Sequence, residues 1–322
     1  MAVPTGAVQT FAMTGIREDL SDVISNISPT ETPFYSMCKK GKTKSRTPEW
    51  QIDTLAAASA SNAAIEGDDA AGDTMTHPTR VKNVVQLFEK VVVVSTSAQA
   101  VDTAGRSSEL KYHVAKSGQE VKRDMEASLT TNNASVVGNA STAGELGGAE
   151  SWIETNVSFG TGGAVGGFNT GTGIVDAATD GTPRTVTEAF LKTVIKSCWT
   201  AGGDPTMIMV GGSTKQVMSG FGGIATQYKD NGSSMKRAVI LGAADYYVSD
   251  FGEHRIVPNR FSRDRTALVL DPKLWSVKFL QPFKTVPLAK TGHSDKRLLS
   301  AEMTLCSHNE AGNGKIAEIT VA

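Results

Sequence analysis

RSSELKYHVAKSGQEVKRDMEASLTT, residues 106–131, is the clearest helical stretch of this 322-residue chain. Its apolar residues recur at three- and four-residue steps, the spacing that lines one face of a helix. Ser107 or Ser108 is placed to cap the first turn. Gly118 lies in the middle of the predicted helix, where it costs about 1 kcal/mol relative to alanine. The apolar stripe consists of Leu110, Val114, Val121, Met125 and Leu129.

The charged residues of this stretch predict a solvated face on the same helix, because oppositely charged side chains near one another suit an exposed surface. Gly118 has two open interpretations. It is either a tolerated bend point or a place where another backbone packs closely against the helix. The charged residues expected on the solvated face are Lys116, Glu120, Lys122, Arg123, Asp124 and Glu126.

The segment before this helix begins as an arm that has no core of its own. Within residues 1–40 the one helical candidate is Ile16–Ile27, which carries an apolar stripe. Pro29 and Pro33 follow it and favour extended backbone. Such a segment cannot fold alone, so we expect it to lie on the rest of the chain or on a neighbouring molecule.

Residues 41–97 predict a long protruding hairpin. Glu49–Leu55 is typical of one strand and Arg80–Thr96 of a second, longer one. Small residues without core-sized side chains join the two. A two-stranded hairpin is only marginally stable in water by itself, so we expect this one to need a partner surface.

Two charged clusters mark the hairpin, one at its start and one at its tip. We expect both to lie at an interface between molecules, where opposite charges set register more than they add affinity. The basic cluster alone would contact phosphate only weakly and in a salt-sensitive way. The basic cluster is Lys39, Lys40, Lys42, Lys44 and Arg46, and the acidic tip is Glu66, Asp68, Asp69 and Asp73.

The rest of the chain predicts an α+β body. Residues 132–185 are rich in glycine and threonine and predict a long loop or a weak hairpin. A second helix begins near Thr187 and ends at Gly202, a natural C-cap. Met207–Val210 predicts a buried strand, Ser213 is placed to cap a further helix, and residues 236–322 alternate strands and turns.

Composition and motifs exclude several classes of protein. The chain has 32 Lys and Arg against 33 Asp and Glu, a balance that argues against a polycation that coats nucleic acid. Its 3 cysteines lie far apart, which argues against a disulfide framework and favours a reducing compartment. The longest uncharged runs are too rich in glycine and threonine to span a membrane. Gly41-Lys42-Thr43 lacks the earlier glycine of a phosphate-binding loop.

No convergent polar constellation stands out in the sequence. The histidines are scattered, so we expect no catalytic residue, no cofactor and no metal site. With an arm, a protruding hairpin and a long helix, the chain is typical of an assembly subunit. The alternatives are a binding module that stays monomeric or forms small rings, and a nucleotide-dependent enzyme.

Several stretches together resemble the SU-ten family of tailed-phage major capsid proteins, which have the Hong Kong 97-like fold. The order of arm, long β-excursion, long helix and mixed body fits that fold. The similarity runs from about residue 30 to the end of the chain. The stretches that carry it are residues 118–126 (GQEVKRDME), 199–205 (WTAGGDP), 250–253 (DFGE), 257–261 (VPNRF), 270–275 (LDPKLW), 288–296 (LAKTGHSDK) and 301–305 (AEMTL).

The resemblance implies a division of the chain into the parts of that fold. The E-loop would lie over the neighbouring subunit, and the axial domain would meet its copies at the five- and six-fold centres. The implied parts are an N-arm at 1–45, an E-loop at 46–97, a peripheral domain at 98–186 with spine helix 106–131 and the glycine-rich loop, an axial domain at 187–285, and a return to the peripheral domain at 286–322.

The resemblance also implies function and partners. It implies a structural protein that self-assembles into the pentamers and hexamers of an icosahedral or prolate shell around double-stranded DNA. A capsid decoration or tail-associated structural protein is the alternative. The implied partners are further copies of the chain, a portal protein, separate scaffolding and decoration proteins, and packaged DNA contacted non-specifically, with no membrane. The implied location is the virion capsid, assembled in the cytoplasm of the bacterial host.

Overall fold

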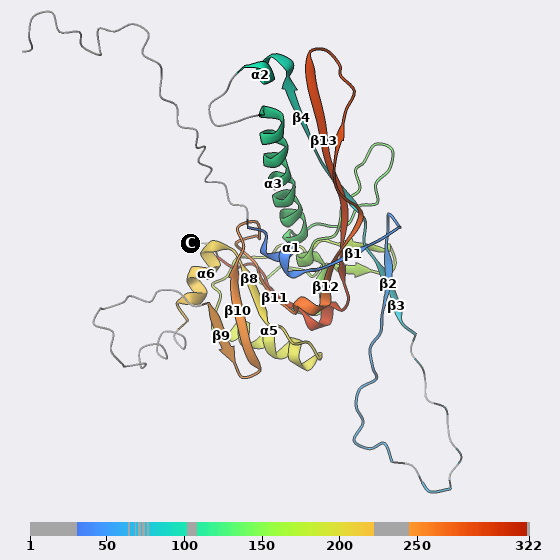
Figure 1. Cartoon of the computed structure of the whole chain (residues 1–322). Coiled ribbons are helices and arrows are strands. Elements are labelled where there is room, and N and C mark those ends of the chain that lie inside the picture. Colours follow the sequence, from blue (N-terminus) through green and yellow to red (C-terminus); the bar gives the residue numbers. More distant parts are fainter. Residues whose placement is uncertain are drawn as a thin grey trace, which may run out of the picture.

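The computed structural model of the chain is an α+β structure with two sheets and a projecting hairpin (Figure 1). It describes residues 31–320 except 64, 68, 70, 71, 73, 74, 76, 102–107 and 222–244. The helix candidate Ile16–Ile27 lies outside the described residues, as do Asp68 and Asp73.

The first sheet has four strands and carries the long helix α3. Its strand order is β1-β12-β13-β4, with β1 parallel to β12 and the other pairs antiparallel. The helix runs beside β4 and β13 (Figure 1). The elements are β1 (Lys39–Lys42), β4 (Gln86–Ser95), β12 (Trp275–Pro287), β13 (Ser294–Ser307), α2 (Thr96–Ala100) after β4, and α3 (Glu109–Thr130).

Helix α3 confirms most of the predicted stripe. Ser108 caps it by accepting a hydrogen bond from the Lys111 backbone N–H at 3.4 Å. Val121, Met125 and Leu129 are buried, whereas Leu110 and Val114 are only half-buried. The half of α3 nearer its N-terminus therefore packs less completely than the periodicity predicts.

The second sheet has six strands in the order β5-β14-β11-β8-β10-β9. Met207–Val210, predicted as a buried strand, is β8 at the centre of this sheet. The elements are β5 (Asn156–Ser158), β8 (Met207–Val210), β9 (Tyr246–Ser249), β10 (Gly252–Pro258), β11 (Ala267–Leu270), β14 (Gly314–Ile316), the helices α5 (Glu188–Thr200) and α6 (Gly212–Ser219), and the short helices η2 (Pro272–Leu274) and η3 (Glu310–Gly312).

The end of α5 and the start of α6 are set by residues next to them in the sequence. Helix α5 ends where Gly202 takes a positive φ of 87°. The N–H of Gly203 then reaches the Cys198 carbonyl at 2.9 Å and the N–H of Gly202 reaches the Trp199 carbonyl at 3.0 Å, a Schellman motif. The prediction that Ser213 caps α6 is wrong, because Gly211 is the N-cap and Ser213 hydrogen-bonds Asp264.

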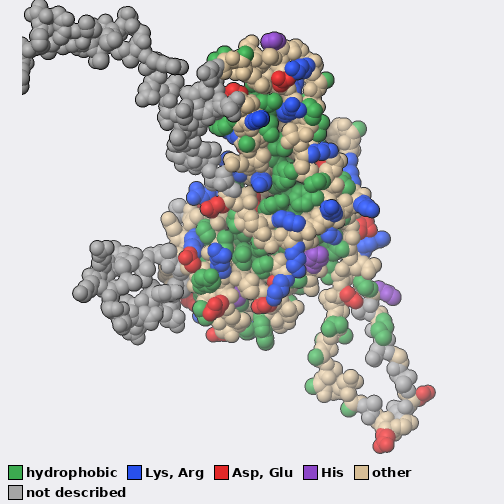
Figure 2. Space-filling view, viewed as in Figure 1, with side chains coloured by type: hydrophobic (Ala, Val, Ile, Leu, Met, Phe, Trp, Pro, Cys, Tyr) green, Lys and Arg blue, Asp and Glu red, His purple; other side chains and the backbone are tan. Residues whose placement is uncertain are grey.

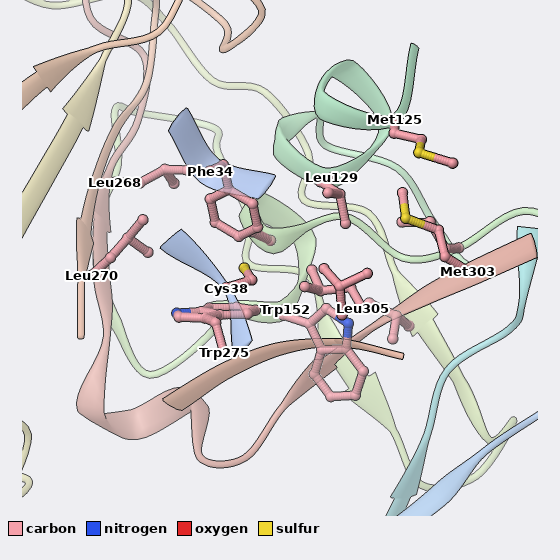
Figure 3. Close-up of a cluster of buried hydrophobic side chains, with 14 of the residues drawn as sticks. Phe34, Cys38, Met125, Leu129, Trp152, Leu268, Leu270, Trp275, Met303 and Leu305 are labelled. Atoms are coloured by element: carbon pink, nitrogen blue, oxygen red, sulfur yellow. The ribbon is translucent and has the colours of Figure 1, made fainter. Parts of the chain in front are cut away.

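The two sheets share one apolar core (Figure 3). Successive residues of β8 point to opposite faces of their sheet. Met209 enters the shared core, while Ile208 and Val210 enter a second cluster with α5 and α6. The shared core includes Phe34, Met125, Leu129, Trp152, Leu268, Leu270, Trp275, Met303 and Leu305.

The single strand predicted from Arg80 to Thr96 is wrong, because the structure has two strands there. Strand β3 (Thr79–Lys82) pairs with β2 (Glu49–Ile52), and β4 pairs with β13 in the first sheet. Asn83 lies between β3 and β4, and its side-chain amide donates to the carbonyls of Gly147 at 3.1 Å and Leu305 at 2.8 Å. These side-chain bonds tie the chain to two distant segments at the break between the strands.

The glycine-rich stretch is more ordered than the predicted loop or weak hairpin. It contains α4 (Ala149–Trp152), β5, and a hairpin of β6 (Gly167–Asn169) and β7 (Ile174–Asp176). Val175 is completely buried and Phe168 packs against the shared core. Here glycine permits close backbone approach: a Cβ at Gly160 would collide with the carbonyl oxygen of Thr182.

Candidate assembly surfaces

The projecting hairpin has a short paired base and a long extended tip (Figure 1). Strands β2 and β3 pair from Glu49 and Lys82 to Ile52 and Thr79. Beyond this base, none of the described residues from 53 to 78 belongs to a strand, and all are exposed. Three of these exposed side chains are large and apolar: Leu55, Ile65 and Met75. A tip of this kind lacks any core within its own chain.

The acidic residues of the tip are placed as the sequence predicts, as far as they are described. Glu66 and Asp69 are both exposed. Figure 2 shows acidic side chains at the end of the hairpin, while Lys and Arg side chains are scattered over this face of the body. The tip therefore presents apolar and acidic groups together.

A second exposed apolar surface lies on the first sheet. Strand β4 alternates, with Phe88, Val92 and Val94 buried. Lys90 lies on the same face and pairs with Glu120 of α3 at 3.2 Å, so that face points toward the helix. The opposite face carries Leu87, Val91 and Val93 at 53%, 52% and 54% exposure. We name these three residues the β4 stripe.

Strand β4 is also an edge strand of its sheet. An edge presents unpaired backbone groups, and a long apolar edge is a template for pairing with another chain. The residues opposite the β4 stripe on β13 are Glu302, Leu298 and Lys296. The surface around the stripe therefore combines apolar side chains with charges of both signs.

The basic cluster forms the opposite edge of the same sheet. Lys39, Lys40 and Lys42 belong to β1, which pairs with β12, and the remaining two residues, Lys44 and Arg46, follow directly. All five side chains are exposed. Within the described part of the chain, none of these five forms an ion pair. The structure brings the basic cluster together on an edge, away from the described end of the projecting hairpin of the same chain (Figure 1).

The end of the arm is fixed to the body by the buried carboxylate of Glu126. Glu126 was expected on the solvated face of α3, but it is fully buried. Its Oε1 and Oε2 accept the backbone N–H groups of Phe34 and Tyr35, each at 2.7 Å. The Asn259 side chain donates to Oε1 at 2.7 Å. Burial raises the pKa of Glu126, and these donors oppose that shift.

The position of Glu126 on the helix explains its burial. It follows Met125 directly and lies three residues before Leu129, so it borders the apolar stripe rather than the opposite face. Short helix α1 (Pro33–Met37) then brings its first backbone N–H groups to the carboxylate. The neighbouring hydrophobic residues were the signal in the sequence for this site.

A second buried charge cluster holds the C-terminal strand. Lys315 of β14 is 1% exposed, and its Nζ donates to the Glu150 backbone carbonyl at 2.6 Å. Burial lowers the pKa of Lys315 to about 8. The Glu150 carboxylate pairs with Arg263 at 3.3 Å, and Arg263 also pairs with Asp180 at 2.6 Å. These contacts join α4, the loop at Asp180 and β14.

No group of three or more His, Cys, Asp and Glu side chains among the described residues is placed to hold a metal ion. The cysteines Cys38, Cys198 and Cys306 are buried and free, and burial raises each thiol pKa. No helix in the described ranges is both long enough and apolar enough to cross a bilayer.

Comparison with known proteins gives one consistent picture. The family model described as SU10 major capsid protein matches residues 4–320. The major capsid protein of Escherichia phage Phieco32 is 27% identical over 355 residues, covering 98% of this chain and 97% of that protein. The capsid asymmetric unit of cyanophage A-1(L) matches with a TM-score of 0.63 at 13% identity, covering 97% of this chain and 98% of that one.

A further solved structure is similar over the whole length. It contains the gp27 major capsid proteins and gp26 decoration proteins of phage G, and it matches with a TM-score of 0.56 at 7% identity, covering 99% of this chain and 100% of that one. At this identity the likeness concerns the fold. The fold of this chain is the Hong Kong 97-like fold that the resemblance implies.

Proposed function

Because this chain belongs to the SU10 major capsid protein family and is a structural protein of a phage capsid shell, we propose that its copies join through the projecting hairpin. The alternative of a decoration or tail-associated protein is less consistent with a family match over residues 4–320. The proposal concerns how the shell is held together.

The observation that carries this proposal is the exposed apolar tip of the hairpin. Leu55, Ile65 and Met75 are 99%, 77% and 80% exposed in the single chain. Burying a side chain of this size contributes roughly 1.5–3 kcal/mol, and no described residue of the same chain covers these three. A neighbouring copy supplies the missing surface.

The surface that fits this tip is the β4 stripe with its charged surroundings. Both surfaces are apolar at the centre. The exposed edge of β4 offers backbone groups that an extended segment can pair with. The acidic residues Glu66 and Asp69 then meet Lys or Arg side chains of the neighbour, such as Lys296 of β13, which lies beside the stripe.

Such a contact joins different surfaces of two copies, and heterologous contacts that close generate rings. We therefore propose pentamers and hexamers as the rings of the shell. Each contact can be individually weak, because many act at once and raise the effective local concentration. The basic cluster would contact packaged double-stranded DNA only weakly and without sequence preference.

The parts of the subunit follow the implied division, with one refinement. The arm at 1–45, the E-loop within 46–97, the peripheral domain at 98–186, the axial domain at 187–285 and the return at 286–322 stay proposals. Since β4 pairs with β13, we assign the projecting part of the E-loop to residues 49–82.

Further partners follow from the class of protein. A portal protein and a separate scaffolding protein are proposed for assembly in the cytoplasm of the bacterial host. The phage G structure contains decoration proteins beside the major capsid protein, and we propose that a shell of this chain offers comparable positions for a decoration protein.

The test reverses charges at the tip. Replacing Asp68 and Asp69 by lysine should leave the thermal unfolding of the subunit unchanged and should reduce shell formation seen by electron microscopy. The isosteric pair Asp68→Asn and Asp69→Asn serves as a control and should reduce assembly less. Normal shells from the lysine variant would contradict an interface at the tip.

A further inference from the structure

The base of the projecting hairpin is seated on the glycine-rich segment 138–173. We propose that Trp152 and Phe168 are positioning residues, which fix the direction in which the hairpin leaves the body. Trp152 does so by packing against Trp50, and Phe168 does so by stacking on Trp152. This inference rests on the proposed function, in which that direction decides where the tip meets its neighbour.

The first leg of the hairpin is held by an aromatic ladder. Trp50 of β2 lies against Trp152, with ring centroids 5.5 Å apart and planes tilted by 36°. Trp152 stacks on Phe168 of β6 at 6.0 Å and 6°. Such aromatic pairs stabilise a fold beyond the area they bury. The ladder thus runs from the hairpin into the glycine-rich segment.

Trp50 is also held by a hydrogen bond and by a nearby lysine ammonium. Its Nε1 donates to the Ser307 carbonyl at 2.6 Å. The Lys278 ammonium lies 5.6 Å from the centroid of its ring. Because the stacking and the hydrogen bond come from different segments, the indole cannot turn without losing both kinds of contact.

The second leg rests on the same glycine-rich segment. Val81 of β3 is 5% exposed. Lys82 lies close to Gly173, where an added Cβ would come within 2.9 Å of the Lys82 side chain. Asn83 and Gly147 form a reciprocal pair: the Asn83 amide donates to the Gly147 carbonyl at 3.1 Å, and the Gly147 N–H donates to the Asn83 Oδ1 at 2.8 Å.

Arg46, which precedes β2, contacts the glycine-rich segment as well. The Arg46 guanidinium lies against the loop at 138–144, where an added Cβ at Gly138 or Gly144 would come within 2.7 Å or 3.3 Å of it. Glycine at these positions allows the close approach. Both legs are therefore clamped to one segment, and the hairpin is free to bend only beyond Ile52 and before Thr79.

The sequence pattern alone predicts a long loop or a weak hairpin for this segment. The contacts give it a specific role: it is the seat of the hairpin. A small change of the seat is amplified along the hairpin, because the described residues between 53 and 78 are all exposed and belong to no strand or helix.

The experiment compares Phe168→Ala with Phe168→Tyr and with Phe190→Ala in the full chain. Tyrosine keeps the ring. Phe190 is a partly buried ring that packs against the second cluster and not against the shared core, so it provides a matched truncation. Three quantities are measured: thermal unfolding of the subunit, hydrogen exchange of β2 and β3, and the assembled product by electron microscopy.

A spectroscopic readout reports the seat directly. Two indoles as close as Trp50 and Trp152 couple their electronic transitions and give paired circular-dichroism bands of opposite sign. Trp50→Phe removes one partner and identifies these bands. We expect Phe168→Ala to weaken them, to speed exchange in β2 and β3, and to give fewer or misshapen shells. Phe168→Tyr should behave as the wild type. Phe190→Ala should lower the thermal stability of the subunit but keep the paired bands, the slow exchange of β2 and β3 and normal shells.

The proposal is overturned if Phe168→Ala keeps the paired bands and the slow exchange, or if it loses them and still forms normal shells. Should Phe168→Ala fail to fold, Gly173→Ala disturbs the seat from the Lys82 side, and the same outcomes decide. If wild-type subunits show the paired bands but never assemble, the proposed function fails instead, so the two failures can be told apart.

Discussion

The Oε1 atom of Glu126 accepts a hydrogen bond from the backbone N–H of Phe34 over 2.7 Å and so fixes the end of the arm to the long helix. The Phe34 ring is completely buried and meets Trp275 edge-on, with centroids 5.8 Å apart. Asn259, from the segment after β10, donates to the same oxygen. One carboxylate thus joins the arm, α3 and the six-stranded sheet.

Replacing Glu126 by glutamine should destabilise the subunit by about 1–3 kcal/mol. The amide keeps one acceptor oxygen. Its NH₂ group would face a backbone N–H that donates to a carboxylate oxygen in the wild type, and that N–H would lose its acceptor. Chemical denaturation measures the loss. The control is Glu120→Gln, which weakens a half-buried pair with Lys90 and should change stability by less than about 1 kcal/mol. Equal effects of the two variants would contradict the buried anchor.

Lys315 predicts a specific pH dependence. Its pKa is lowered from 10.5 to about 8, with burial as the main cause. Above pH 8 the folded chain loses this proton while the unfolded chain keeps it, so stability rises with pH until about 10.5, by at most roughly 1.4 kcal/mol per pH unit. Lys315→Met lacks this contribution. The difference in unfolding free energy, wild type minus variant, should therefore increase across this window; a constant difference would contradict the account.

Replacing Gly118 by alanine tests its two open interpretations, a bend point or close packing of another backbone. Among the described residues outside α3 itself, a Cβ there would meet only the Leu299 side chain, at 3.8 Å, so no other described backbone segment of this chain packs closely against Gly118. Gly118→Ala should stabilise the subunit by about 1 kcal/mol. Gly148→Ala is the contrasting control, because its Cβ would collide with the Thr131 carbonyl oxygen. If Gly118 is a bend point, Gly118→Ala shells should mature more slowly; maturation at the normal rate would remove that interpretation.

The β4 stripe should matter for assembly and little for folding. Replacing Val91 and Val93 by threonine keeps their shape and β-branching, so subunit stability should stay within about 0.5 kcal/mol. Shell formation, followed by light scattering, should fall. Val92→Thr provides the opposite case, because Val92 is buried and an unpaired buried hydroxyl costs about 1–3 kcal/mol. Unchanged assembly of the double variant would exclude the stripe from the interface.

The sequence predicts those elements whose formation depends on residues close together in the chain. The stripe through Val121, Met125 and Leu129 identifies α3, and the glycines after α5 identify its end, because both depend on residues a few positions apart. The break at Asn83 could not be predicted in this way. Its partners, Gly147 and Leu305, are distant in sequence, and the apolar residues on both sides continue the strand pattern.

The same reason explains the sites that sequence reasoning missed. Glu126 resembles any charged residue on a helix until Phe34 and Asn259 arrive from other parts of the chain. The valines of β4 indicate a strand, but only the structure shows which face is buried and which stays open. The acidic tip and the basic cluster were predictable as surface features, whereas their role at an interface stays a prediction.

Hydrogen exchange of the hairpin tip in assembled shells, compared with free subunits, tests most directly whether copies of the chain complete one another. The described tip residues around Leu55, Ile65 and Met75 should exchange fast in free subunits and at least tenfold more slowly in shells. Core helix α3 provides the internal reference in both samples. A tip that exchanges as fast in shells as in free subunits would contradict the account.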